Sequence, residues 1–253
     1  MADFPSSYSE LYFSYVLMKK NQLDLAHPKD EGPDIYIKTL DTWVEIITAK
    51  DGDKSNPNSI PDLVSNQVYT SLQNQLKLRL TSCISEKKLQ HNKHLRKGSV
   101  SSTQGLVIGI NGGWLSGLTG IPAYPVGGFP EIVQVLFGIG FMVFDLSKET
   151  GKILGTRFES QTSIPKISAK TGLIPIDIGH FLKPENSHIS AVIYSYANIN
   201  TGVDIENLGT DFITVHNPYA VKKLPTGIIN CGIEYKAESD DDNITITKID
   251  HDS

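Results

Sequence analysis

Residues 32–47 constrain the fold of this chain most, because they read as a tight β-hairpin. Residues 32–37 and 43–47 are rich in apolar and aromatic side chains, and the polar residues 38–42 lie between the two runs. Two short apolar runs with such a break are typical of antiparallel strands joined by a turn. We take this hairpin as the element around which the rest of the fold is organised.

The hairpin carries two acidic residues that its register brings together. If the turn centres on Thr39 and Leu40, Asp34 on the first arm lies opposite Glu45 on the second. Paired positions of an antiparallel ladder have Cβ atoms roughly 4.5–5.5 Å apart. Two carboxylates at that separation repel each other unless a positive group lies between them. A hard divalent cation would serve, whereas an ordinary hairpin with one capping Asp and one exposed Glu is the alternative.

Residues 72–97 have the strongest helical pattern, and Gly98 is a good stop signal. Lys87 and Gln90 are three positions apart and therefore share one face of the helix. Ile84, three positions before Lys87, places that pair beside the buried apolar stripe. Alternatively, the basic side chains snorkel from an amphipathic helix toward water.

Taken in order, these elements resemble the core of the PD-(D/E)xK, or restriction-endonuclease-like, nuclease superfamily. A helical pattern at residues 9–21 precedes the hairpin, and a continuous apolar run at 105–111 reads as a buried strand after the long helix. The superfamily places Pro-Asp at the start of one strand and an acidic residue in the next. Pro33-Asp34 and Glu45 occupy those two places here.

The resemblance implies a metal site and therefore a cofactor. By its pattern Asp34, Glu45 and the backbone carbonyl of Ile46 would hold Mg²⁺ or Mn²⁺. Glu10, in the predicted first helix, could also project toward these acids. We interpret Glu10 as an acidic residue that favours the helix dipole.

The sequence departs from the superfamily pattern at the catalytic lysine. The usual position, two residues after the second acid, is Ile47. Lys87 on the long helix is the candidate replacement, where it would position the attacking water or stabilise charge on the phosphate. Gln90 would assist by hydrogen bonding.

The charge distribution favours nucleic acid as the partner, although the net charge of −5 does not. Residues 77–97 hold seven Lys or Arg residues against the single acid Glu86. A basic helix can contact phosphates, but a solvated helix face is the alternative. The resemblance favours DNA over RNA. Because nucleases of the restriction type often dimerise, it also implies a homodimer.

The rest of the chain predicts one large α/β domain over residues 1–237. Its mixed central sheet would contain the core order α-β-β-β-α-β and be extended by C-terminal strands. Turn-bounded apolar runs supply those strands at 140–146, 152–158, 190–196 and 211–216. The Gly/Pro-rich residues 111–130 read as a loop, and the acidic residues 238–253 as a flexible tail.

The cellular setting expected is the cytoplasm. The sequence has no run of 18 apolar residues that could span a membrane, and its first ten residues lack the pattern of a secretory signal. Cys83 and Cys231 form neither a CxxC motif nor a disulfide framework.

The function predicted is metal-dependent hydrolysis of phosphodiester bonds in DNA or RNA. Two other functions stay open. One is an interaction protein that has kept the nuclease fold and lost the chemistry, which Ile47 favours. The other is a basic-helix module that binds nucleic acid without a metal.

Overall fold

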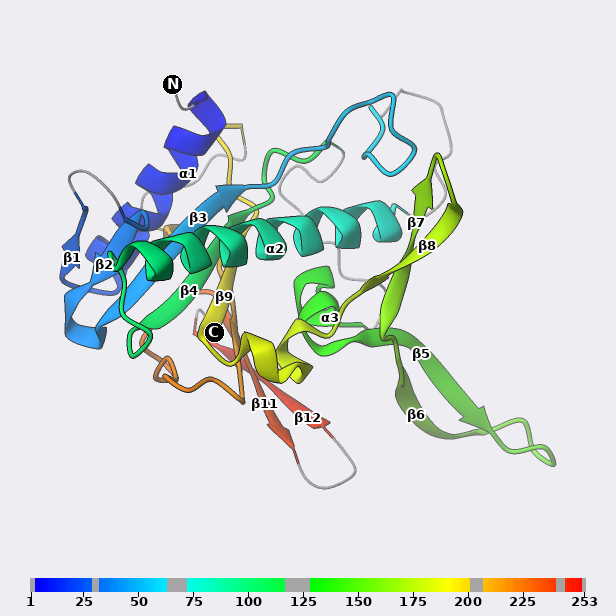
Figure 1. Cartoon of the computed structure of the whole chain (residues 1–253). Coiled ribbons are helices and arrows are strands. Elements are labelled where there is room, and N and C mark those ends of the chain that lie inside the picture. Colours follow the sequence, from blue (N-terminus) through cyan, green and yellow to red (C-terminus); the bar gives the residue numbers. More distant parts are fainter. Residues whose placement is uncertain are drawn as a thin grey trace.

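The protein is an α/β structure built on a large mixed sheet, as the computed structural model in Figure 1 shows. The structure describes residues 3–28, 32–62, 72–116, 128–200, 207–239 and 244–251. Within these residues, eight strands form one sheet in the order β1-β2-β3-β4-β9-β10-β11-β12. The strands are β1 (Leu25–Ala26), β2 (Ile35–Ile37), β3 (Thr42–Thr48), β4 (Gly105–Asn111), β9 (Ile189–Ser195), β10 (Ile213–His216), β11 (Ile233–Ser239) and β12 (Ile244–Asp250).

Parallel strands occupy the centre of the sheet. Strands β3, β4 and β9 run parallel to one another, whereas β2 pairs antiparallel with β3 and β10 pairs antiparallel with β9. Every residue of β4 and β9 is buried. Strands covered on both faces read as continuous apolar runs, which is why both were recognisable in the sequence.

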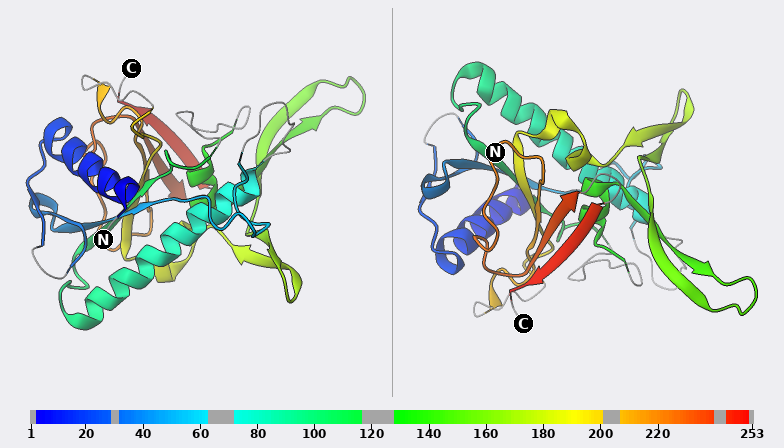
Figure 2. Two further views of the ribbon diagram at one scale, coloured as in Figure 1. Left: turned by 90° about the horizontal axis from the view of Figure 1, so that it is seen from above. Right: turned by 90° about the horizontal axis from the view of Figure 1, so that it is seen from below.

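Helices cover both faces of this sheet, as the two views in Figure 2 show. They are α1 (Phe4–Tyr15), continued by a π-helical turn (Val16–Lys20), then α2 (Gln73–Lys97) and α3 (Glu131–Phe137). Leu80 and Ile84 of α2 pack with Ile108 of β4 on one face. Phe13 of α1 packs with Val107 of β4 on the other face. The alternation of β4 side chains thus separates two hydrophobic cores.

Gly109 allows α1 to lie close to the sheet. A Cβ atom at this position would come within 2.8 Å of the Phe13 ring. Glycine is therefore required by the close approach of the helix rather than by its backbone conformation.

The long helix is confirmed, but the first helix starts earlier than predicted. Helix α2 ends where Gly98 adopts a left-handed conformation with φ of 74°. Helix α1 begins at Phe4 rather than near Ser9, because the Asp3 carboxylate accepts a hydrogen bond from the backbone N–H of Ser6. This N-cap satisfies a backbone N–H of the first turn and thereby extends the helix toward the N-terminus.

Two hairpins stand apart from the main sheet. The predicted pair β5 (Ile139–Leu146) and β6 (Ile153–Ser160) forms its own two-stranded sheet, so these strands do not extend the central sheet as expected. A second hairpin, β7 (Ser163–Ser168) with β8 (Gly172–Asp177), was not predicted. Short 3₁₀ turns at His180–Leu182 and Pro184–Asn186 lead into β9.

The acidic C-terminal segment is not simply a tail. The prediction of a flexible segment over 238–253 is wrong for Ile244–Asp250, which form β12 and pair antiparallel with β11. Ile246 of this strand packs against the hydrophobic core, which fixes β12 on the sheet despite the acidic residues of the segment. Most of the predicted loop at 111–130 falls on residues 117–127, outside the described residues.

Within the described ranges, none of the helices combines the length and the apolar character needed to cross a membrane.

Candidate functional site

The hairpin has the register that brings the two acids together. Ile35 pairs with Val44, so Asp34, directly before β2, lies opposite Glu45. The turn between the strands is a 3₁₀ helix, Lys38–Leu40, after which Asp41 adopts a left-handed conformation with φ of 47°. The Asp34 carboxylate accepts a hydrogen bond of 2.5 Å from the backbone N–H of Ile46, which fixes it at the strand edge.

Lys87 reaches from α2 into the space between these carboxylates. Its Nζ lies 3.4 Å from Oδ2 of Asp34 and 3.2 Å from Oε2 of Glu45. The same ammonium donates a hydrogen bond of 3.0 Å to Oε1 of Gln90, one helical turn along. The Lys87 side chain is only 8% exposed, so its charge acts in a poorly hydrated setting. The structure thus gathers all four side chains singled out in the sequence.

Alternation along β3 explains why a helix can supply the cation here. Glu45 and Ile47 are two residues apart and share the face of β3 that α2 covers. Ile47 packs against the hydrophobic core on that face. The Lys87 side chain extends from α2 toward the same face of β3. The lysine that contacts Glu45 therefore belongs to the covering helix and not to the strand itself.

Glu45 is the most perturbed acid of the site. It is completely buried. Burial raises the pKa of its carboxyl to about 7; the Lys87 ammonium opposes this shift, and the Asp34 carboxylate adds to it. Its Oε1 atom has no hydrogen-bond partner among the residues that the structure describes and lies 3.5 Å from Nε2 of His94.

The sequence interpretation overlooked His94 as part of the site. Its position was readable from the helix, because it lies seven residues, or about two turns, after Lys87 and therefore on the same face.

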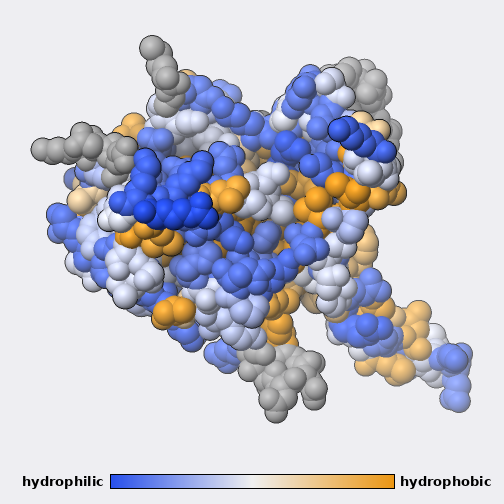
Figure 3. Space-filling model, in the orientation of Figure 1, coloured by the Kyte–Doolittle hydropathy of each residue, from blue (hydrophilic) through white to orange (hydrophobic). Residues whose placement is uncertain are grey.

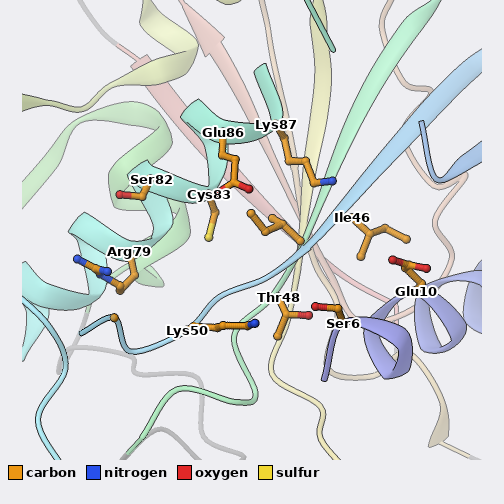
Figure 4. A pocket seen from close by; sticks show the side chains of 12 residues that line it. Ser6, Glu10, Ile46, Thr48, Lys50, Arg79, Ser82, Cys83, Glu86 and Lys87 are labelled. Atoms are coloured by element: carbon orange, nitrogen blue, oxygen red, sulfur yellow. The ribbon is translucent and has the colours of Figure 1, made fainter. Parts of the chain in front are cut away.

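Glu10 also faces the site, contrary to its interpretation as a dipole-favouring residue. Burial raises the pKa of Glu10, the Asp34 carboxylate adds to the rise, and Lys87 opposes it. Figure 4 shows Glu10 reaching from α1, and Lys87 from α2, toward Ile46 on β3. Glu10 is thus a third carboxylate within electrostatic reach of the other two.

A cavity of about 490 Å³ opens beside the acids. Ile46 and Lys87 connect it to the acid pair, and Glu10 lies in its wall. Lys50, which is paired with Asp3, and Arg79 line it as well, as does the acid Glu86. The wall thus holds three cations and two acids, and a concave polar surface of this kind next to paired carboxylates has room for a phosphodiester.

The side chains present fit a hard divalent cation. Asp34 and Glu45 share one ammonium, so the trio keeps a net negative charge when both acids are ionised. No three His, Cys, Asp or Glu side chains of the described residues are arranged to hold a metal by themselves. Mg²⁺ characteristically binds one or two carboxylates and keeps several waters, so two acids and a backbone carbonyl suffice.

The basic residues of α2 fall into a buried group and an exposed group. Lys77 and Lys87 are buried, so they cannot form part of a solvent-exposed basic face. Lys93, Arg96 and Lys97 are exposed near the C-terminal end of the helix. A phosphate-binding surface on this helix is therefore limited to its last turns.

The chain matches no family model, no curated protein and no solved structure.

Proposed function

We propose that this protein is a metal-dependent phosphodiesterase that hydrolyses nucleic acid, with DNA preferred over RNA. The observation that carries the proposal is the convergence of Asp34, Glu45 and Lys87, with both carboxylates within 3.4 Å of the ammonium. Paired acids with an adjacent buried lysine are the groups that such hydrolysis needs.

The order of the elements supports the same proposal. Helix α1, strands β1, β2 and β3, helix α2 and strand β4 follow one another along the chain. This is the order α-β-β-β-α-β of the restriction-endonuclease-like core, including β1, which the sequence did not reveal. Asp34, directly before β2, and Glu45 in β3 lie where a core of this kind would carry its two acids, which supports the proposal.

Asp34, Glu45 and the Ile46 carbonyl would hold Mg²⁺ or Mn²⁺, with Glu10 as a further carboxylate close by. The ion would lower the pKa of bound water and offset phosphate charge. Lys87 would position the nucleophilic water and stabilise the negative charge that develops on the phosphate. Gln90 holds the Lys87 ammonium in place through its hydrogen bond.

Lys87→Ala tests the proposal against a matched neighbour. Removing one preorganised charge from the transition state should slow cleavage at least about a hundredfold. Lys88→Ala is the control, because Lys88 lies near Glu185 and points about 100° away from Lys87 around the helix axis. Cleavage of single- and double-stranded DNA and RNA should be measured in Mg²⁺ and in Mn²⁺. Full activity of Lys87→Ala would exclude the assigned role of Lys87.

A catalytically inactive nuclease fold is the second candidate. It is favoured by the position of Lys87, whose ammonium already bridges the two acids and could replace a cation permanently. In that case wild-type protein cleaves no substrate, and calorimetry with Mn²⁺ gives the same heats for wild type and Asp34→Ala.

A further inference from the structure

The β5–β6 hairpin is an arm that projects from the body of the protein, as Figures 1 and 2 show. Its two strands pair only with each other among the described strands. An isolated two-stranded hairpin is marginally stable in water. An arm of this length is therefore expected to have a partner surface.

The arm exposes an unusual amount of apolar surface, part of which is visible in Figure 3. Its large exposed side chains are Phe141, Phe144, Leu146, Ile153, Leu154 and Phe158, with exposed fractions between 36% and 73%. Taking about 150 Å² for each side chain when fully exposed, they present on the order of 500 Å². A standard interface buries about 800 Å² per partner, so this surface is a large share of one.

The charges of the arm argue against nucleic acid as its partner. Asp145, Glu149 and Glu159 balance Lys148, Lys152 and Arg157, so the arm has no net charge. Binding to a phosphate backbone relies on an excess of Lys and Arg. A neutral, apolar and strand-edged surface instead suits another protein strand.

We infer that the arm joins two copies of this chain, with the free edge of β6 pairing antiparallel to β6 of the second copy. One register satisfies the charges of the strand. Against β5, Gly155 and Ile153 pair with the successive residues Asp145 and Leu146, so Leu154 is an extra, bulged residue of β6. With Leu154 left out of the count and the two-fold axis at Thr156, Thr156 faces its own mate and Lys152 lies opposite Glu159 of the second copy. The reverse pair forms as well. The arrangement is isologous and closed, as in most homodimers.

The same register also pairs the apolar residues. It sets Ile153 of one copy opposite Phe158 of the other. Phe158 lines a cavity of about 450 Å³ at the base of the arm, together with Phe129 and Ile246, and Glu159 lies in the same wall. The tip of each arm thereby covers the cavity at the base of the other arm. The apolar surface that one chain exposes is then buried against the second copy.

Charge reversal at the two paired positions tests this arrangement. Lys152 and Glu159 are both exposed, so Lys152→Glu and Glu159→Lys leave the fold of the chain intact, and circular dichroism verifies this. Sedimentation equilibrium of wild type should show a dimer. Each single variant should dimerise at least about tenfold more weakly, because like charges then face each other. The double variant restores both pairs and should regain wild-type dimerisation.

Other results would overturn the inference. A wild-type chain that stays monomeric at 100-fold the concentration of a cleavage assay has no such interface. Single variants that dimerise like wild type would show that the arm is not the interface, and a double variant that is not rescued would exclude this register. A monomer whose single variants lose affinity for duplex DNA would identify the arm as a nucleic-acid wedge. Since none of these readouts requires cleavage, they are independent of the proposed nuclease activity.

Discussion

Metal affinity should increase steeply with pH because Glu45 must lose its proton to act as a ligand. Burial raises the pKa of this carboxyl to about 7. At pH 6 only about one tenth of the protein has Glu45 ionised, and at pH 8 about nine tenths. Metal ligands bind in their deprotonated forms. The apparent affinity for Mn²⁺ should therefore rise about tenfold between pH 6 and pH 8.

Calorimetry provides two independent readings of this prediction. The dissociation constant is measured directly, and titrations in buffers of different ionisation enthalpy count the protons released. Binding at pH 6 should release nearly one proton, and binding at pH 8 only about one tenth of a proton. An ordinary carboxylate with a pKa near 4.5 would release almost none at either pH.

Two variants make this experiment decisive. Glu45→Gln should bind Mn²⁺ weakly and lose the pH dependence, whereas Glu185→Gln removes an exposed glutamate outside the site and should behave like wild type. Equal affinity of wild type at pH 6 and pH 8, with no proton release, would refute the assignment of Glu45 as a buried metal ligand.

Three further outcomes follow from the same geometry. In metal-free protein, Glu45→Gln should leave the free energy of unfolding unchanged at pH 4 and increase it by up to about 3 kcal/mol at pH 8, measured by denaturant unfolding. The reason is that ionising the buried Glu45 destabilises the fold fully above pH 7 and not at all below pH 4.5. Destabilisation by Glu45→Gln at pH 8 would show that the Lys87 ion pair outweighs the effect of burial. Glu10→Gln should weaken Mn²⁺ binding about tenfold by calorimetry, and an unchanged constant would remove Glu10 from the site. Replacing Lys93, Arg96 and Lys97 by Ala should reduce the slope of log K against log salt for DNA by up to about 2.7, and an unchanged slope would show that the end of α2 does not contact phosphates.

The parts of the site that the sequence predicted are those fixed by local periodicity. The opposition of Asp34 and Glu45 followed from the turn position alone, because a hairpin register has a period of two. The pairing of Lys87 with Gln90 followed from helical spacing. Neither prediction required knowledge of how the helix packs on the sheet.

The missed elements lack such local signals or carry conflicting ones. The hairpin of β7 and β8 has Pro165 opposite Pro175, and proline in a run argues against a strand. Helix α3 is buried on all sides, so it has no amphipathic pattern. Strand β1 has only two residues, and in β12 the acidic composition of the segment outweighed the two isoleucines, Ile244 and Ile246, that share one face.

Because Lys87 lies on α2 and not on β3, the geometry of the site depends on how the helix packs on the sheet. A lysine at position 47 would be held beside Glu45 by the strand itself. Here that position is an isoleucine that packs in the core between β3 and α2, and the cation comes from α2 instead. The distance between the ammonium and the acids is then set by contacts such as that of Ile84 with β4, far along the chain. Because packed cores resist small displacements, this arrangement keeps Lys87 preorganised without a local tether, and it makes the geometry of the site depend on the same hydrophobic contacts that hold the fold together.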